Sequence, residues 1–257
     1  MIRLGQHFLT DKNALKKIVA LLDLKESDTV IEIGPGHGEL TEELRFKNKD
    51  LRIIAIEKDE LLANDLRSKI YDLGIKNVDI ITGDALKILK SLIINLKSYK
   101  IVGNIPYYIT GKLLRTIGEL EKKPEVSVLT IQKEVAERLT ANPPKMNRLA
   151  ASVQFWAKPE IAFIISRNDF NPAPEIDSAT IVLKKAAPRK IEAGTYYEAV
   201  RAVFAQPRKT ILNNLFASLK ISKNEIEVGL RKADIGPASR PQNLSVENII
   251  ELASLYF

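Results

Sequence analysis

The chain has 257 residues, of which 45% are hydrophobic and 28% charged, a composition typical of a globular protein with a sizeable core. It has no cysteine, which excludes a disulfide framework, a thiolate metal site and a cysteine nucleophile. Only two histidines are present, His7 and His37, so we expect no bound metal. Lysines interrupt the N-terminal segment early, so we predict no signal peptide, no membrane span and a cytoplasmic location.

The net charge is +7, and the excess of basic residues is spread along the chain. Residues 1–185 hold 29 basic against 25 acidic side chains, and residues 186–257 hold 10 against 7. A basic surface favours polyanions such as nucleic acids. Solvated, lysine-rich helix faces are the alternative, and the charge alone does not separate the two.

From residue 29 onward, apolar strand-like runs alternate with helical patterns. The predicted strands are residues 29–33, 51–57, 78–81, 100–103 and 126–132. The helical patterns that follow them are residues 40–46, 58–71, 86–96, 112–120 and 133–140. Strands that alternate with helices predict an α/β fold, with a parallel sheet covered by helices on both faces.

The pattern changes after the last of these helices. Two further predicted strands, residues 161–167 and 180–185, have no helix between them, so we expect them to pair as an antiparallel hairpin at the edge of the sheet. Residues 186–189 have the composition of a linker, and beyond them the pattern is helical only. We therefore predict two domains, an α/β domain of residues 1–185 and a small all-helical domain of residues 186–257.

Candidate ligand-binding residues follow three successive predicted strands. The first strand runs into a glycine-rich turn that contains Gly34, where the backbone can approach a ligand closely. Glu57 ends the second strand, where a carboxylate can accept both hydroxyls of a ribose, whether of NAD or of S-adenosylmethionine. Asp84 follows the third strand and either accepts an adenine amino group or caps the next helix. Because these strand ends share one sheet edge, we expect a nucleoside cofactor there.

The fourth predicted strand leads into the sequence Asn104, Ile105, Pro106 and Tyr107. Proline stiffens the loop, and the Asn104 side-chain oxygen and the Ile105 backbone carbonyl are outward-facing acceptors. Two acceptors beside the flat ring of Tyr107 suit the planar amine of a heteroaromatic base, held next to the cofactor. The alternative is a tight turn in which the asparagine caps the backbone and the tyrosine is half buried.

Several motifs occur in an order that resembles one family. They are residues 5–9 (GQHFL), 32–36 (EIGPG), 83–85 (GDA), 104–107 (NIPY), 132–138 (QKEVAER), 170–179 (FNPAPEIDSA), 204–215 (FAQPRKTILNNL) and 240–245 (RPQNLS). Together they look like the ribosomal RNA adenine N6,N6-dimethyltransferase family of the bacterial KsgA type, over essentially the whole chain. The first motif precedes the first helix and is either a lid over the cofactor or an arm that buries Phe8 and Leu9.

This resemblance implies a Rossmann-like class I S-adenosylmethionine-dependent methyltransferase. Its expected substrate is a pair of adjacent adenosines in the hairpin loop near the 3′ end of 16S rRNA, in the assembling small subunit, and we expect it to act as a monomer. Carried over by motif, the expected cofactor contacts are His7, Leu9, Gly34, Glu57, Asp84 and Asn104. We consider three alternatives: a non-catalytic RNA-binding assembly factor, an erythromycin-resistance-type 23S rRNA adenine methyltransferase, and a DNA adenine methyltransferase. The last has a similar acceptor loop, but the order of the motifs and the helical C-terminal part argue against it.

The resemblance also implies how the target base is held. Asn104, Ile105 and Pro106 form the acceptor loop, and the base stacks on Tyr107, with Phe170 on the opposite wall. The alternative for Phe170 is a core position in an edge strand. In the second domain, we expect Arg208 and Lys209, at the start of a helix, to contact rRNA phosphates. Pro207 replaces the polar residue that the family pattern has before this pair, which leaves the path of the segment open.

Overall fold

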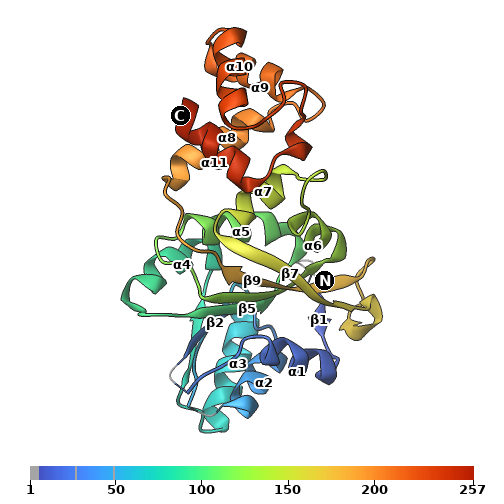
Figure 1. The fold of residues 1–257 in the computed structure, drawn as a ribbon. Coiled ribbons are helices and arrows are strands. Elements are labelled where there is room, and N and C mark those ends of the chain that lie inside the picture. The colour runs from blue at the N-terminus through green and yellow to red at the C-terminus, as the bar shows by residue number, and fades with distance from the viewer. Residues whose placement is uncertain (1–5, 27, 49) are drawn as a thin grey trace. The chain divides into compact units, whose positions relative to one another are not determined.

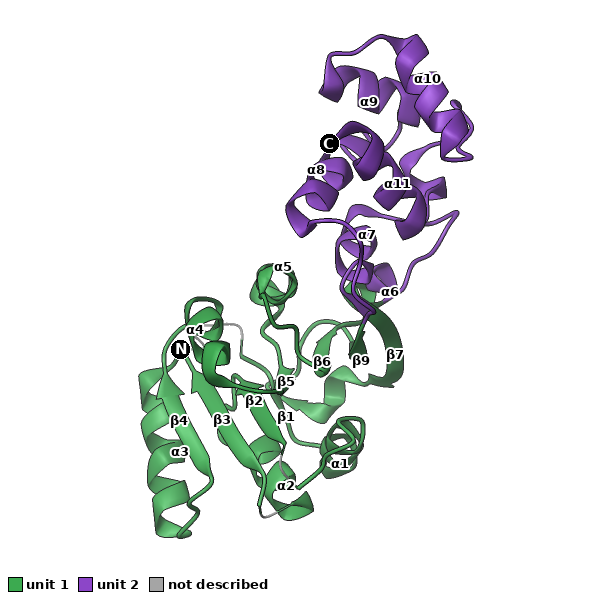
Figure 2. Cartoon of the chain, turned by 60° about the vertical axis from the view of Figure 1, so that its left-hand side comes forward, with its two compact units in different colours: residues 1–136, 158–185 green, residues 137–157, 186–257 purple. Residues whose placement is uncertain are grey.

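The computed structural model describes residues 6–26, 28–48 and 50–257 (Figure 1). The chain forms two compact units (Figure 2). One unit comprises Met1–Ala136 and Lys158–Lys185, and we call it the sheet unit. The other comprises Glu137–Ala157 and Ala186–Phe257, and we call it the helical unit.

The main sheet of the described chain has seven strands: β2 (Thr29–Ile33), β3 (Arg52–Glu57), β4 (Val78–Thr82), β5 (Lys100–Asn104), β6 (Val126–Gln132), β7 (Ala157–Ile165) and β9 (Ser178–Lys185). Their order across the sheet is β4-β3-β2-β5-β6-β9-β7. Strands β2 to β6 pair in parallel, whereas β9 is antiparallel to β6. The predicted α/β sheet with an antiparallel edge is confirmed.

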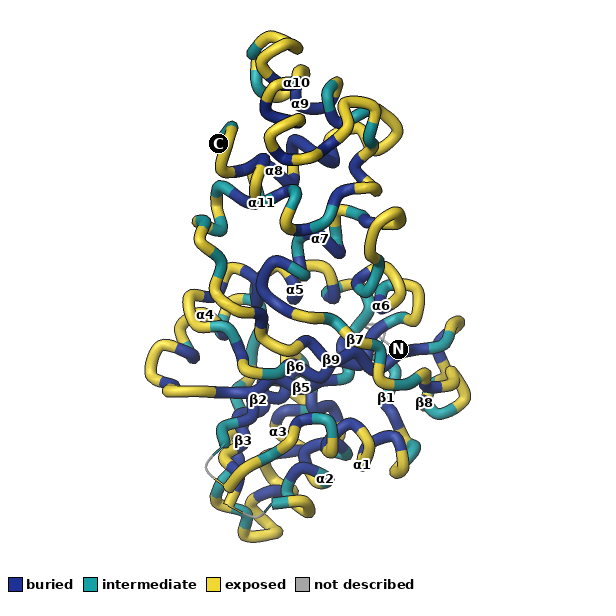
Figure 3. The backbone as a smooth tube through the Cα atoms, in the orientation of Figure 1, coloured by how far each residue is buried: buried dark blue, intermediate teal, exposed yellow. Residues whose placement is uncertain are grey.

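Helices cover both faces of this sheet (Figure 1). Helices α1 (Lys12–Ala20), α2 (Glu39–Lys47) and α3 (Glu60–Asp72) lie on one face, and α4 (Ala85–Leu92) and α5 (Thr110–Glu119) lie on the other. Apolar residues of β2, β3 and β5 are buried beneath them, which is why these strands read as nearly continuous hydrophobic runs (Figure 3).

The strand order reverses between β2 and β5. Strands β3 and β4 lie on one side of β2, whereas β5 and β6 lie on its other side. In open parallel sheets, ligands bind in the crevice outside the carboxyl ends of the strands at such a switch point. The candidate residues Gly34, Glu57 and Asn104 all lie at this edge, since each ends a strand or directly follows one.

A second, two-stranded ladder ties the N-terminal arm to the segment after β7. β1 (Phe8–Leu9) pairs antiparallel with β8 (Phe170–Asn171), so that Leu9 lies opposite Phe170. The Thr10 backbone N–H also donates to the Asp169 carbonyl over 2.9 Å. The sequence pattern did not predict this ladder, because strands of two residues carry no periodicity.

The helical unit contains α7 (Arg148–Gln154), α8 (Ala193–Val203), α9 (Ile211–Leu219), α10 (Lys223–Lys232) and α11 (Val246–Tyr256), and α6 (Lys133–Leu139) runs into it from the sheet unit. The division into domains of residues 1–185 and 186–257 stays a prediction. In the structure, residues 137–157 belong to the helical unit together with residues 186–257. The reason is packing: the Phe155 ring stacks on Tyr196 at 4.1 Å, and Tyr196 Oη donates to the Ala151 carbonyl over 2.9 Å. Among the described residues, no helix has the length and apolar character that a bilayer crossing requires.

A buried ion pair holds the start of β5. Lys100 Nζ lies 2.7 Å from Asp28 Oδ2 and 2.7 Å from the Asp23 carbonyl oxygen, and the Asp28 side chain is 12% exposed. The replacement Lys100→Met leaves that carboxylate without its counter-charge. We expect it to lower the free energy of unfolding by about 3–5 kcal/mol, measured by urea denaturation.

The exposed pair Arg115–Glu119 provides the matched control. Arg115→Met should cost less than about 1 kcal/mol, because an exposed pair gains little in water. Equal losses in the two variants would show that the Lys100 pair is not a buried electrostatic contact.

Candidate functional site

An open pocket lies at the switch point of the sheet, where ligands of open parallel sheets bind. Four segments of the sheet unit line it, with Gln6, His7, Phe8, Gly34, Gly36, Glu57, Asn104, Ile105, Pro106 and Tyr107. A second cavity shares Phe8, Gly34 and Asn104 with this pocket. The structure therefore brings His7, Gly34, Glu57 and the 104–107 loop together, although they are far apart in sequence.

The Asn104 side chain is oriented by the N-terminal arm. Its Nδ2 lies 2.7 Å from the His7 backbone carbonyl oxygen. Because a carbonyl only accepts, the amide nitrogen must face it, and the Oδ1 atom is left free as an acceptor. The next peptide is fixed as well, since the Ile105 N–H donates to the Thr130 carbonyl over 3.0 Å. Within the described chain, no group donates to Asn104 Oδ1 or to the Ile105 carbonyl, so the loop offers the two acceptors that the sequence indicated.

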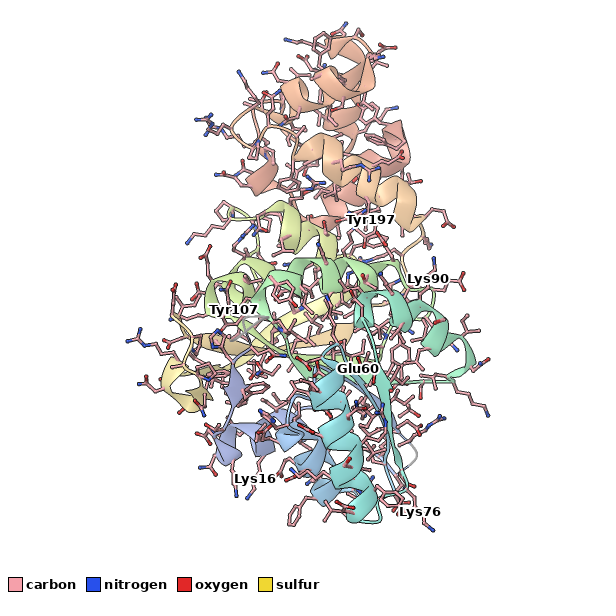
Figure 4. The ribbon with its side chains drawn as sticks, turned by 180° about the vertical axis from the view of Figure 1, so that it is seen from behind. Lys16, Glu60, Lys76, Lys90, Tyr107 and Tyr197 are labelled. Carbon is pink, nitrogen blue, oxygen red and sulfur yellow. The ribbon has the colours of Figure 1, made fainter. Side chains whose placement is uncertain are left out.

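The Tyr107 ring, labelled in Figure 4, is half buried and held in place by its hydroxyl. Tyr107 Oη and Ser178 Oγ form a hydrogen bond of 2.9 Å. Burial raises the pKa of the Tyr107 phenol, so the ring stays neutral. The His7 ring lies against it, with 5.9 Å between ring centroids and 29° between ring planes. A flat, fixed aromatic surface therefore stands beside the two acceptors.

Glu57 is a preoriented acceptor at the end of β3. Its Oε2 accepts from the Gly36 N–H over 3.1 Å and its Oε1 from the Asp59 N–H over 2.9 Å. Each carboxylate oxygen keeps a further lone pair, so the pair suits two neighbouring hydroxyls. Gly36 has a φ of +59°, and a Cβ there would lie 2.7 Å from the Phe8 ring, so glycine is required on both grounds.

Asp84 follows β4 and caps α4. Its Oδ1 accepts from the Leu86 N–H over 3.0 Å, and its Oδ2 lies 3.8 Å from Lys58 Nζ. Gly83 donates to the Glu57 carbonyl over 2.7 Å, which keeps Asp84 at the same sheet edge. Asp84 lines neither of the two cavities described above. The helix-cap interpretation is confirmed, and contact with an adenine amino group stays a prediction.

Phe170 does not face the pocket. Its side chain is 5% exposed and packs in the same hydrophobic core as Leu9, its partner in the β1–β8 ladder. The pocket lining does not include it. The structure thus places Phe170 at the core position that was its alternative, and its part as a stacking wall stays a prediction. The ring that stacks against Tyr107 is that of His7.

The N-terminal arm is both pocket wall and core element. Gln6, His7 and Phe8 line the pocket, while Leu9 is buried and lines the adjoining cavity. His7 Nδ1 lies 2.8 Å from the Pro172 carbonyl oxygen, so this nitrogen carries the proton and donates. Gly5, which opens this motif, lies outside the described residues.

Glu32, to which sequence reasoning gave no role, lines the adjoining cavity. Thr41 Oγ1 donates to its Oε2 over 2.7 Å, whereas Oε1 is buried and has no hydrogen-bond partner in the described chain. Burial raises the pKa of the Glu32 carboxyl to about 8, and the charges of Glu39 and Glu57 add to this effect. Its place one residue before the end of β2, just ahead of the glycine-rich turn, was the available signal.

Arg208 and Lys209 lie in the helical unit, on an exposed turn before α9. They precede the helix instead of starting it, because Thr210 is the N-cap and its side chain accepts from the Asn213 N–H. Neither forms an ion pair with a described residue.

Comparisons with known proteins identify the relatives of the chain. The sequence profile of the family described as "Ribosomal RNA adenine dimethylase" matches residues 1–256. A ribosomal RNA small subunit methyltransferase A from Dehalococcoides mccartyi is 40% identical, and the match covers 98% of this chain and 87% of that protein. A protein of the same name from Caldanaerobacter subterraneus subsp. tengcongensis is 37% identical, over 98% of this chain and 96% of that one.

Solved structures agree with this relationship. A dimethyladenosine transferase from Plasmodium falciparum has a TM-score of 0.80 and 26% sequence identity, over 96% of each chain. The 23S rRNA methyltransferase ErmE has a TM-score of 0.76 and 25% identity, over 97% of this chain and 99% of the other.

The mixed sheet with its pocket at the switch point defines a class I S-adenosylmethionine-dependent methyltransferase. Within that class, the chain belongs to the ribosomal RNA adenine dimethylase family. The resemblance that the ordered motifs indicated is thereby confirmed.

The raised pKa of the Glu32 carboxyl makes the free energy of unfolding depend on pH. The folded protein holds this proton up to about pH 8, whereas an ordinary glutamate releases it near 4.5. Proton binding therefore stabilises the folded state fully below pH 4.5, and this contribution is lost as the pH rises to 8, by up to about 1.4 kcal/mol per pH unit.

Glu32→Gln fixes the neutral form. We expect urea midpoints of the wild type to fall between pH 5 and 8, and those of the variant to lack this component. Glu39→Gln, on the neighbouring helix α2, is the control and should keep most of the slope. The same slope in wild type and Glu32→Gln would mean that Glu32 is ionised in the folded protein.

Proposed function

We propose that this chain dimethylates N6 of two adjacent adenosines in the 3′-terminal hairpin loop of 16S rRNA, in the assembling small subunit, with S-adenosylmethionine as methyl donor. The observation that carries the proposal is the oriented Asn104 amide, whose free Oδ1 stands with the Ile105 carbonyl beside the Tyr107 ring. Relatives named small subunit methyltransferase A, at 40% and 37% identity, favour small-subunit rRNA as the substrate.

S-adenosylmethionine, when bound, supplies an electrophilic methyl group on a positively charged sulfur. The pocket suits such a molecule: Gly34, with a φ of +68°, leaves the backbone open to close approach, and Glu57 is preset for a ribose. The buried Oε1 of Glu32, which has no hydrogen-bond partner in the described chain, is a polar atom that a ligand can satisfy. We assign the cofactor contacts to His7, Leu9, Gly34, Glu57, Asp84 and Asn104.

The acceptor loop makes N6 reactive. The N6 lone pair is delocalised into the adenine ring, which makes N6 a poor nucleophile. Asn104 Oδ1 and the Ile105 carbonyl accept the two N6 hydrogens and draw the nitrogen towards tetrahedral geometry, which localises the lone pair. N6 gains positive charge during alkylation, so these oxygens stabilise the transition state more than the ground state. The alkylated nitrogen is acidic and releases its proton to water, so the loop needs no strong base.

The target adenine must leave its stack to enter the pocket. Stacking on Tyr107 offsets about 1–3 kcal/mol of that cost. The bond from Tyr107 Oη to Ser178 keeps the ring in place, and Pro106 stiffens the loop that carries it. Phe170 is buried and does not line the pocket, so Tyr107 carries the stacking in this proposal.

The alternatives have less support than dimethylation of 16S rRNA. A non-catalytic assembly factor has no need for an oriented acceptor loop beside a preset Glu57 carboxylate. A 23S rRNA methyltransferase is favoured only by the likeness to ErmE, at 25% identity, which is below the identity to the small-subunit relatives.

The substrate sets the location, since small subunits are assembled in the bacterial cytoplasm. A monomer suffices, because one chain supplies all the pocket residues.

The activity and its site are tested together by transfer of labelled methyl groups to small subunits that lack the modification. Asn104→Ala removes one of the two N6 acceptors, and a hydrogen bond to a group that gains charge contributes about 1.5–3 kcal/mol. We expect the rate to fall roughly ten- to a hundredfold, with a much smaller change in cofactor affinity. Asn95→Ala, at an exposed site of the same unit, should be unaffected. Wild-type turnover from Asn104→Ala would refute the mechanism.

Cofactor binding is tested by calorimetry on the free protein. Glu57→Ala should weaken S-adenosylmethionine binding by about tenfold or more, because two ribose hydroxyls lose their acceptor. Asp84→Asn should also weaken binding while it keeps the α4 cap, since asparagine caps as well as aspartate but presents a donor to the adenine amine. If Asp84→Asn binds normally and only Asp84→Ala lowers the melting temperature, Asp84 is a helix cap and nothing more.

We infer that Arg208 and Lys209 contact rRNA phosphates. Each phosphate contact adds about one unit to the slope of log affinity against log salt, so the double replacement by alanine should flatten that slope by up to about two units. Binding to unmodified small subunits, titrated with salt, measures this. Cofactor affinity should stay unchanged, because neither residue lines the pocket. An unaltered slope, with the fold intact by circular dichroism, would assign the pair to a solvated surface.

A further inference from the structure

The exposed cations Arg208 and Lys209 lie on a closed turn. The Lys209 N–H donates to the Gln206 carbonyl over 2.9 Å, which closes a four-residue turn over residues 206–209. Pro207 occupies the second position of this turn, where its fixed φ is favourable, and Arg208 occupies the third. No acidic residue occurs anywhere in residues 203–218, so the turn presents positive charge alone.

A buried side-chain amide on α9 forms two hydrogen bonds with the backbone of the first residue of the turn. The Asn214 side chain is 2% exposed, and its Oδ1 accepts from the Gln206 N–H over 3.0 Å. Its Nδ2 donates to the Gln206 carbonyl, also over 3.0 Å. Both backbone polar groups of Gln206 are therefore satisfied by one side chain. Among side chains of this size only asparagine supplies a donor and an acceptor in that arrangement, because aspartate lacks the donor and leucine lacks both.

We propose that Asn214 and Pro207 are positioning residues that hold the Arg208–Lys209 turn in its binding conformation before rRNA arrives. The inference rests on the proposed phosphate contact of that pair. A loose segment must lose backbone freedom when it binds, whereas a segment that is already ordered does not. Pro207, which departs from the family pattern, thus adds stiffness at the point where the two cations are presented.

This role has a signature that differs from that of the charges themselves. Removing a cation removes a phosphate contact and so flattens the salt dependence of binding. Loosening the turn leaves both cations in place, so the bound state keeps its contacts and the slope stays the same. Only the affinity falls, by a similar factor at every salt concentration.

The experiment measures binding of the full-length protein to unmodified small subunits across a range of salt concentrations. Asn214→Ala and Pro207→Gly should each weaken binding by between about fivefold and thirtyfold, the factor for fixing the backbone of one residue, with an unchanged salt slope. Asn213→Ala, an exposed neighbour on the same helix, is the matched control and should bind as the wild type does. Pro207→Gly changes only an exposed turn, so it carries the test if the buried Asn214→Ala change prevents folding.

The same changes are then made in the Arg208→Ala/Lys209→Ala background, where no cations remain to be positioned. We expect no further loss of affinity there. A loss of the same size in both backgrounds would assign Asn214 and Pro207 to general stability, and wild-type affinity of both single variants would also overturn the inference.

Failure of this inference is distinguishable from failure of the proposed activity. If the double alanine variant keeps the wild-type slope and affinity, Arg208 and Lys209 do not contact phosphates, and the inference about Asn214 and Pro207 is refuted with that contact. Methyl transfer by the wild-type protein, measured at saturating small subunits, still decides the activity by itself.

Discussion

The site depends on one hydrogen bond, from Asn104 Nδ2 to the His7 carbonyl. An amide that is free to rotate would present its donor and its acceptor to the pocket in turn, and a donor would repel the N–H groups of an adenine amine. The bond removes this ambiguity because the His7 carbonyl takes up the donor. It also links the two halves of the site, since His7 belongs to the N-terminal arm and Asn104 ends β5.

The arm has to be held for this bond to persist, and the structure holds it in several ways. The β1–β8 ladder fixes its path, His7 donates to the Pro172 carbonyl, and Leu9 is buried in the core. Phe170 contributes here as the ladder partner of Leu9. Phe170 thus supports the site indirectly, because its packing helps to hold the N-terminal arm in place.

Much of the site could be predicted because parallel strands share a carboxyl edge. Gly34, Glu57 and Asn104 each end or follow a predicted strand, so periodicity alone places them together. The bond to His7 was out of reach, because a backbone carbonyl 97 residues away leaves no mark in the sequence. The sequence left two orientations open for the Phe170 side chain for a related reason, since its orientation is set by the register of a two-residue ladder. The sequence likewise gives no sign of the stacking between Phe155 and Tyr196, which packs residues 137–157 in the helical unit.

The two units divide the chemistry between them. The sheet unit supplies every residue that lines the pocket, and the helical unit supplies the Arg208–Lys209 turn. Their electrostatics differ accordingly. The cofactor side contains the buried Glu57, whose carboxylate suits the ribose of the methyl donor, and the buried Glu32, whereas the turn is purely basic and suits a polyanion. Both partners of the proposed reaction therefore meet complementary charge on one chain.

The account is tested most directly by offering the protein and labelled S-adenosylmethionine to four acceptors in parallel. These are small subunits that lack the modification, naked small-subunit rRNA, large subunits and DNA, each followed by analysis of the modified nucleosides and their positions. The account predicts N6,N6-dimethyladenosine at two adjacent positions of the 3′-terminal hairpin in small subunits, and no label in large subunits or DNA. Label in large-subunit rRNA, or none in any acceptor, would contradict it.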